Sequence, residues 1–384
     1  MNAPQTIAPA CSLAPQPHGG LEVWSILTSL TTGGAESLVV NLDRSFRQAG
    51  MTHKVVALCD AATLGNSCKT ERRIANRIED DGGTFVSLGL SRNRNPLAGI
   101  AALNRLLQTG RPHVIHAHTA RAVPIAAHSR HRGALVMTHH NSRLSFPRGA
   151  FRYLDLVVDT YVAISAETEA LYRAVCRKPV RRIANGVPES FLSERRSAPR
   201  RPPFTVMSVG AISEQKNYRL LIAAAREIRN RAAGNPVVKF RIAGGGQSLD
   251  SLRCEVDAAG LAGSVEFVGE RSDVPILLGT ADLFLNTSRY EGQSIAMLEA
   301  MAMALPVVAT DVPGNRNLVV PGHNGLLAPL DDPGAIADAI IRLADDPQLY
   351  ASMSDGARAT GRQFTVEATA ADHRALYASL VSNG

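Results

Sequence analysis

A chain of 384 residues, 45% of them hydrophobic and 5% aromatic, is too long for one ordinary core and too apolar to stay disordered. We therefore expect two folded domains. Its five Cys include no CxxC pair, which gives no zinc-ribbon signal and fits a reducing compartment. Residues 1–20 lack the basic and apolar regions of a signal peptide and read as a disordered lead-in, and no apolar run reaches the roughly 20 residues of a membrane helix.

The positive charge is concentrated in the first half. The formal net charge is +7, but residues 1–200 carry 25 Lys and Arg against 14 Asp and Glu, a net charge of +11. The arginines are scattered with few aromatics between them, so we expect no nucleic-acid partner. Two interpretations remain open: a solvated surface, or attraction to an anionic membrane face or a phosphate-bearing acceptor.

Short apolar runs and helical patterns alternate along the first half. The predicted strands are 21–30, 53–59, 84–90, 113–118, 134–140 and 160–165. One helical pattern runs through Leu38 to near Gly50, and another covers 97–107. Strands that alternate with helices indicate right-handed βαβ units and a parallel sheet.

The alternation restarts after a Pro- and Arg-rich segment at 193–203, which we interpret as a linker. The predicted strands that follow are 204–210, 237–246, 265–269, 282–288, 306–311 and 325–330, with helices at 219–231, 295–303, 334–343 and 366–380. The sequence thus predicts an α/β fold of two doubly wound domains. We expect a lead-in over 1–20, an acceptor domain over 21–198, a nucleotide-sugar domain over 199–365, and a last helix over 366–384 that can cross back to the first domain.

Open parallel sheets bind ligands at the carboxyl ends of their strands, and the candidate site residues fall at such ends. Gly33-Gly34 follows the first strand, where the backbone can approach an anion closely. His116 and His118 form an HxH at the end of another strand. No carboxylate lies near them in the sequence, so we expect no metal site. Alternate strand residues face opposite ways, so one of these two His can face a ligand while the other packs.

Two Glu separated by seven residues give the strongest signal. Glu291 follows the strand 282–288, and Glu299 lies in an otherwise apolar helix, where a carboxylate without a partner is costly. The amides of 292–295 begin that helix, and bare N–H groups at a helix start attract phosphate. Carboxylates on both sides of them can accept hydrogen bonds from sugar hydroxyls. Lys216, in the loop after the strand 204–210, can add a positive charge.

Taken together, these motifs resemble the retaining glycosyltransferases of family 4, which have the GT-B fold of two Rossmann-like domains facing each other across a cleft. The resemblance covers about residues 21–380. Its motifs are a GGAE loop at 33–36, the HxH at 116–118, a TxH-like segment at 138–140, an NGV at 185–187, a Lys-Asn at 216–217 and the EX7E signature of Glu291 and Glu299.

The resemblance implies a role for each matching residue. Glu299 would hold the nucleotide ribose, and Glu291 would hold hydroxyls of the donor sugar. His118 would face the transferred sugar near its reacting centre, and the loop 268–273 would border the base. The residues that would bind the diphosphate are Gly33, Gly34, Lys216, Gly292, Gln293, Ser294 and Ile295. We expect His118, Glu291 and Lys216 to act in catalysis.

One position departs from the family. Many members carry Arg directly after the glycine that ends the first strand of the second domain, and this chain has Ala211 there. A diphosphate contact would then be either lost or supplied by another group, with Arg241 and Arg316 as the candidates.

The resemblance implies a transferase that moves a hexose-type sugar from a UDP- or GDP-linked donor to a lipid-linked or glycan acceptor in surface polysaccharide assembly. It implies no metal and no other cofactor, and a cytoplasmic protein that can bind peripherally to the inner face of the membrane. Three alternatives stay open: a nucleotide-sugar epimerase of the same fold, a glycoside hydrolase that uses Glu291 and Glu299 as acid and base, and a two-lobed binding protein without catalysis.

Overall fold

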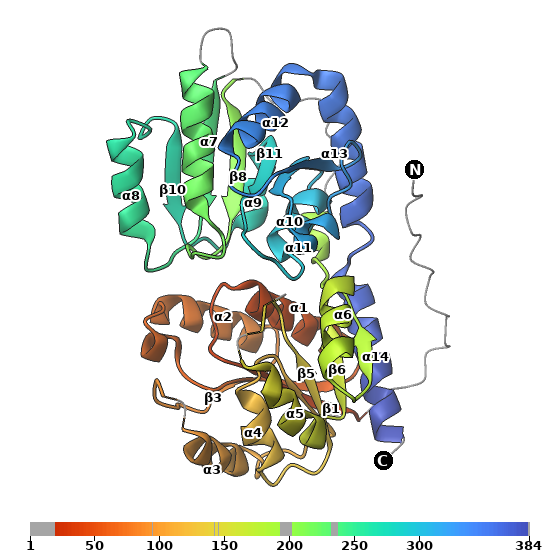
Figure 1. Cartoon of the computed structure of the whole chain (residues 1–384). Coiled ribbons are helices and arrows are strands. Elements are labelled where there is room, and N and C mark those ends of the chain that lie inside the picture. The colour runs from red at the N-terminus through yellow and green to blue at the C-terminus, as the bar shows by residue number, and fades with distance from the viewer. Residues whose placement is uncertain are drawn as a thin grey trace.

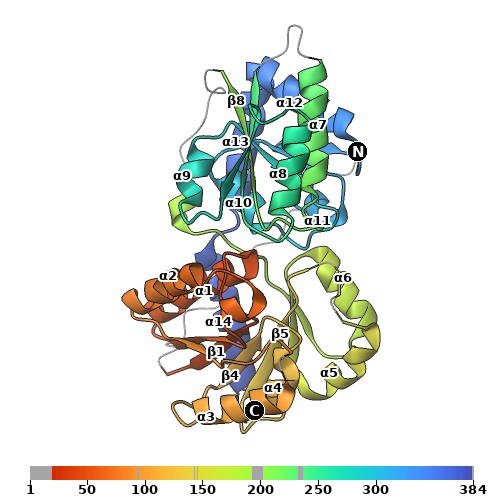
Figure 2. The same ribbon diagram turned by 90° about the vertical axis from the view of Figure 1, so that its left-hand side faces the viewer.

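The structure is a computed structural model that describes residues 20–93, 95–141, 143–144, 146–192, 202–231 and 237–382. Two α/β domains lie one above the other (Figures 1 and 2). The expected lead-in at 1–19, nearly all of the expected linker and the expected boundary at 198–199 lie outside the described residues.

The N-terminal domain contains a seven-stranded parallel sheet in the order β3-β2-β1-β4-β5-β6-β7. Its strands are β1 (Glu22–Leu27), β2 (Thr52–Ala57), β3 (Phe85–Ser87), β4 (Val114–Ala117), β5 (Ala134–Thr138), β6 (Thr160–Ala163) and β7 (Val180–Arg182). The helices are α1 (Gly34–Gln48), α2 (Cys68–Asp80), α3 (Pro96–Leu106), α4 (Ala122–Ala127), α5 (Phe151–Val157) and α6 (Ala166–Val175). The central strands are buried on both faces, which explains why they read as unbroken apolar runs rather than as alternating patterns.

The C-terminal domain repeats this design with six parallel strands in the order β10-β9-β8-β11-β12-β13. These are β8 (Phe204–Val209), β9 (Val238–Ala243), β10 (Val265–Gly269), β11 (Leu283–Asn286), β12 (Val307–Thr310) and β13 (Gly325–Ala328). The helices are α7 (Tyr218–Asn230), α8 (Leu249–Ala258), α9 (Val274–Gly279), α10 (Ile295–Ala302), α11 (Pro313–Arg316), α12 (Pro333–Asp345) and α13 (Pro347–Gly361). The predicted fold class, two doubly wound Rossmann-like domains, is confirmed.

The strand order reverses once in each sheet, between β1 and β4 and between β8 and β11. The carboxyl ends of the strands flanking such a reversal leave a crevice, which is where doubly wound proteins bind ligands. The loops that leave β1, β8 and β11 lead into α1, α7 and α10. The topology therefore places the predicted motifs of both domains at their switch points.

The last helix, α14 (Val366–Ser382), packs against α1 of the N-terminal domain and lies beside that domain in Figure 1. Thr369 Oγ1 donates a hydrogen bond to the Ala184 carbonyl oxygen at 2.9 Å. Tyr377 is fully buried, and its hydroxyl lies 2.7 Å from Nδ1 of His116. A helix that follows the C-terminal domain in sequence thus completes the N-terminal core.

A buried polar chain fixes α1 against the sheet. Asp43 Oδ1 lies 2.8 Å from Nδ1 of His53, whose Nε2 lies 2.9 Å from the Ser25 hydroxyl. The other oxygen of Asp43 pairs with Arg47 at 2.9 Å. Ser25, His53 and Asp43 are at most 3% exposed. Because no substrate can reach this Ser-His-Asp chain, its role is structural.

Candidate active site

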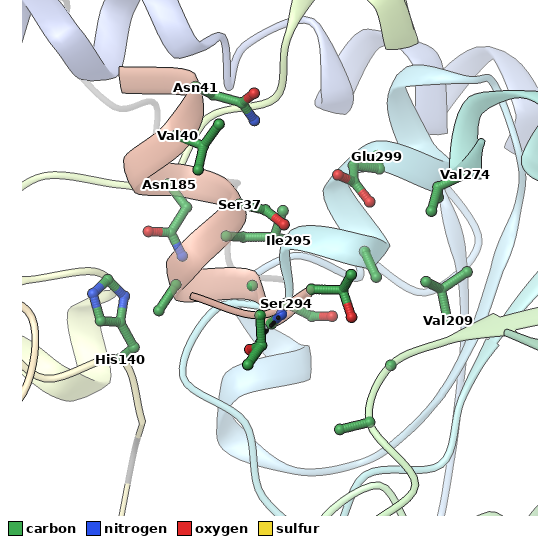
Figure 3. Close-up of a pocket in the computed structure, with 18 of the residues that line it drawn as sticks. Ser37, Val40, Asn41, His140, Asn185, Val209, Val274, Ser294, Ile295 and Glu299 are labelled. Atoms are coloured by element: carbon green, nitrogen blue, oxygen red, sulfur yellow. Dashed lines mark hydrogen bonds between the residues drawn. The ribbon is translucent and has the colours of Figure 1, made fainter. Parts of the chain in front are cut away.

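A cavity of about 610 Å³ lies between the two domains and is lined by residues of both. On the N-terminal side its wall includes the loop at 31–34 and side chains of α1 and α2. On the C-terminal side it includes residues of the β8–α7 loop, the start of α10 and the beginning of α9. Figure 3 shows Ser37, Val40 and Asn41 on α1 across from Glu299 on α10. The cavity therefore opens onto the switch points of both sheets.

Eight of the predicted site residues line this cavity, and two do not. Those on its wall are Gly33, Gly34, Lys216, Glu291, Gln293, Ser294, Ile295 and Glu299. His118 and Gly292 are not among the lining residues. Segments more than 250 residues apart in sequence, such as Gly33 and Glu299, thus share one site.

Lys216 and Glu291 form an ion pair at the cavity wall. The Lys216 Nζ lies 2.9 Å from Glu291 Oε2, and the side chains are 19% and 10% exposed. The Ser288 hydroxyl donates a second hydrogen bond to the same carboxylate oxygen at 2.8 Å. Charge-assisted hydrogen bonds in a partly dry site hold both groups in defined positions. The pair presents a fixed ammonium and a fixed carboxylate to a ligand.

The start of α10 is capped by its own chain. The Ser294 hydroxyl accepts a hydrogen bond from the Met297 N–H at 3.3 Å, which is the usual role of an N-cap serine. A Cβ added to Gly34 would lie 3.5 Å from Cδ1 of Ile295, so the loop after β1 lies directly against this helix start. Ser294, Ile295 and Ala296 at this helix start line the cavity, and the first turn of a helix offers free N–H groups that can attract an anion.

Gln293 is occupied by a contact between the domains. Its side-chain oxygen accepts a hydrogen bond from the Asn185 N–H at 2.6 Å, and its carbonyl oxygen accepts one from Asn185 Nδ2 at 3.3 Å. Asn185 belongs to the NGV segment and also lines the cavity. Both residues therefore clamp the two domains together beside the helix start.

Glu299 is half-buried on α10, and burial raises the pKa of its carboxyl to about 8. Among the described residues no group donates a hydrogen bond to its side chain. A ligand that brings hydroxyl donors would stabilise the ionised form of this carboxyl, because hydrogen bonds to a carboxylate lower its pKa. The Glu299 carboxyl can therefore accept hydrogen bonds from a ligand with several hydroxyl groups.

The structure places His140 at the cavity wall and His118 next to it. Nδ1 of His118 lies 3.0 Å from Nε2 of His140, and the two rings stack with their centroids 5.2 Å apart. Burial lowers the pKa of His140 to about 3 and that of His118 well below its usual range, so both rings are neutral at pH 7. Within the described part of the chain, Nε2 of His118 and Nδ1 of His140 are buried without a partner. His140 was missed as a site residue because adjacent His139 and His140 gave no indication of which ring faces the cleft.

Gly292 packs between the domains and does not line the cavity. A Cβ at this position would lie 2.9 Å from the His140 carbonyl oxygen and 2.9 Å from Cδ1 of Ile164. A side chain here would push the loop before α10 away from the N-terminal domain. The glycine is explained by this close approach, independently of any ligand.

Neither candidate for the charge missing at Ala211 reaches the cavity. Ala211 itself lines it, but Arg241 pairs with Glu266 at 3.1 Å and Arg316 pairs with Asp311. Neither arginine is among the lining residues, so this expectation is wrong. Each guanidinium already has a carboxylate partner on its own domain.

Three other arginines line the cavity: Arg271 lies in the loop 268–273 that the resemblance placed beside the base, and the other two, on α2, were not predicted. Arg73 and Arg77 come from α2, and Arg271 comes from the loop after β10. The signal that could have found the first two is their spacing of four in the segment ERRIANRIED, which puts both side chains on one helix face.

In the described part of the chain no three His, Cys, Asp or Glu side chains gather as metal ligands would. No helix in the same residues has the length and apolarity required to span a bilayer.

Two family models match adjoining parts of the chain. Residues 32–191 match Glycosyltransferase Family 4, and residues 192–360 match Glycosyl transferases group 1. The HepE protein of Anabaena, solved in complex with UDP-glucose, superimposes with a TM-score of 0.78 at 22% identity over 94% of this chain and all of that chain. The chain therefore has the GT-B fold, and its two domains match two glycosyltransferase family models.

Two relatives that are named as sugar transferases match this chain over different lengths. The lipopolysaccharide core biosynthesis mannosyltransferase LpsB of Rhizobium meliloti is 40% identical over 133 residues, which is 34% of this chain and 38% of LpsB. The UDP-Gal:α-D-GlcNAc-diphosphoundecaprenol α-1,3-galactosyltransferase of Escherichia coli is 25% identical over 73% of this chain and 80% of its own length. The chain thus spans about two-fifths of the first relative and four-fifths of the second.

Proposed function

We propose that this protein is a retaining glycosyltransferase that moves a hexose-type sugar from a UDP- or GDP-linked donor to a hydroxyl of a lipid-linked or glycan acceptor. One observation carries the proposal: the Lys216–Glu291 ion pair, the start of α10 and the half-buried Glu299 all face the same cavity between the domains. A cation, bare amides and carboxylates are the groups needed to bind a diphosphate and the hydroxyls on either side of it.

In this proposal the chemistry is mainly electrostatic. Negative charge develops on the diphosphate as its bond to the anomeric carbon breaks, and Lys216 with the first amides of α10 stabilises that charge. Glu291 accepts hydrogen bonds from the sugar, and Glu299 accepts them from the ribose. An oxygen of the departing diphosphate takes the proton of the acceptor hydroxyl on the same face, which retains the configuration. His118 does not line the cavity, so in this proposal it influences the sugar site through its contact with His140, which does. The proposal includes no metal and no other cofactor.

The donor and acceptor classes are supported by the relatives. HepE is described in complex with UDP-glucose, and the Escherichia coli relative is named for a UDP-galactose donor and a diphosphoundecaprenol acceptor. The net charge of +11 on residues 1–200 would favour an anionic acceptor and peripheral contact with the inner, cytoplasmic face of a membrane. We infer a role in the assembly of surface polysaccharide.

A thermal-shift screen with UDP, GDP and ADP tests the donor site first, since a ligand at a hundred times its Kd stabilises by about 2.7 kcal/mol. The sugar nucleotide of the base that binds is then incubated with lipid-linked glycans, and the anomeric configuration of the product is read by NMR. Release of the nucleoside diphosphate that depends on acceptor, with retained configuration, is expected. Hydrolysis of an aryl glycoside without nucleotide would instead indicate a hydrolase, and conversion of the donor sugar without acceptor an epimerase.

A further inference from the structure

The α2 helix of the N-terminal domain contacts the C-terminal domain at the edge of the cavity. Thr70 Oγ1 donates a hydrogen bond to Glu270 Oε2 of the C-terminal domain at 3.1 Å. Glu270 lies in the loop after β10, the loop whose Arg271 and Ser272 line the cavity. One turn further along α2, Arg73 lies close enough to influence Asp273: its charge helps Arg271, the main cause, to hold the pKa of that carboxyl below its usual range. The helix thus lies over the end of the cavity that this loop borders.

Two arginines of α2 line this cavity, and neither forms an ion pair with a described carboxylate, although the charge of Arg73 acts on Asp273. Arg73 and Arg77 are among its lining residues, and neither forms an ion pair or a side-chain hydrogen bond with any described residue. The other lining cations, Lys216 and Arg271, are paired with Glu291 and Asp273. The charge of the α2 pair is therefore available to a ligand.

The spacing of these arginines is unfavourable for the helix alone. Side chains four residues apart lie on the same helix face, and like charges there repel each other. Lys69 and Arg72 line a surface groove on α2 together with Arg73 and Arg77, and Asp80 and Asp81 at the end of the helix line the same groove. Such an arrangement is stabilised when an anion lies between the guanidinium groups.

The resemblance to family 4 implies an arginine against the diphosphate directly after Gly210. Ala211 occupies that position and is exposed to the cavity. Arg241 and Arg316 are held elsewhere by Glu266 and Asp311.

We propose that Arg73 and Arg77 of α2 are donor-binding residues that contact the phosphates of the sugar nucleotide from the N-terminal domain, in place of the arginine missing at Ala211. This inference rests on the proposed function and adds to it, because it moves part of the phosphate site from the nucleotide domain to the acceptor domain. Nucleotide binding then couples directly to closure of the cleft, since α2 and the start of α10 belong to different domains.

The test is calorimetric titration of the full-length protein with UDP and GDP, and with the matching nucleosides, in the absence of any acceptor. Arg73→Ala and Arg77→Ala are each expected to lower the affinity for the nucleoside diphosphate about tenfold, which corresponds to the loss of one charge-assisted contact. The affinity for the nucleoside should not change. Arg72→Ala is the matched control, because Arg72 lies on the same helix but is not a lining residue of the cavity; it should bind like the wild type. Adding Ala211→Arg to Arg77→Ala should restore most of the affinity.

Unchanged diphosphate affinity in both single variants, or a rise only in the KM of a phosphate-bearing acceptor, would overturn this inference and leave the proposed function standing. A wild-type protein that binds neither UDP nor GDP would overturn both. Circular dichroism checks that each variant is folded, and the rescue by Ala211→Arg distinguishes a lost phosphate contact from a damaged helix.

Discussion

Nucleotide binding to this protein should release a proton from Glu299. Burial raises the pKa of that carboxyl to about 8, so at pH 7 about nine-tenths of the molecules carry the proton. A ribose hydroxyl that donates to the carboxylate favours the ionised form and lowers the pKa. If binding returns it to the usual 4.5, about 0.9 proton leaves per nucleotide at pH 7 and about 0.1 at pH 9. The apparent affinity should rise about tenfold between these two pH values.

Titration calorimetry in two buffers of different ionisation enthalpy measures the released protons directly. The Glu299→Gln variant should release almost none and bind more weakly. Asp372→Asn is the matched control, because burial also raises the pKa of Asp372 but this residue lies on α14 and does not line the cavity; this variant should behave like the wild type. A binding enthalpy of the wild type that is the same in both buffers would refute the reasoning, as would equal proton release by Glu299→Gln.

The same pKa sets the pH dependence of stability. The unfolded chain loses the Glu299 proton near pH 4.5, while the folded protein keeps it up to about pH 8. The contribution of Glu299 to folding therefore falls as the pH rises through this window, and Glu299→Gln should flatten that part of a urea-denaturation series.

Further substitutions test other parts of the structure. Lys216→Ala should lower kcat by about 100- to 1000-fold, as loss of one transition-state donor does, measured by release of nucleoside diphosphate. Asp43→Ala should lower the free energy of unfolding by about 3–5 kcal/mol in urea, because it leaves the Arg47 guanidinium and the buried His53 ring without the carboxylate that they contact, and Asp43→Asn should cost less. Gly314→Ala should weaken nucleotide binding, because its Cβ would lie 2.1 Å from the Glu291 carbonyl oxygen, whereas Gly149→Ala, with no atom within 4 Å, should have no effect.

Much of the fold could be predicted because its strands are buried on both faces. Runs such as 55–58 and 134–137 are continuous and apolar, and turn residues separate them from helical patterns. The strand β7 was missed because Val180–Arg182 is short and two of its three residues are exposed. The helix α2 was missed for a related reason: Cys68–Asp80 is strongly polar and buries only Ile78 fully, so it gives little apolar periodicity.

The candidate site was predictable where local sequence decides the geometry. Glu291, Lys216 and the start of α10 lie at strand ends, and parallel topology brings such ends together. Contacts between the domains could not be derived in the same way. The engagement of Gln293 by Asn185 depends on how two separately folded sheets face each other.

The most direct measurement is a crystal structure of the protein with the nucleoside diphosphate that stabilises it most. We expect the phosphates within hydrogen-bonding distance of Lys216 Nζ and the amides that begin α10, with the ribose hydroxyls on Glu299. Density for the nucleotide outside the interdomain cavity, or with its phosphates turned away from both Lys216 and α10, would contradict the proposed donor site.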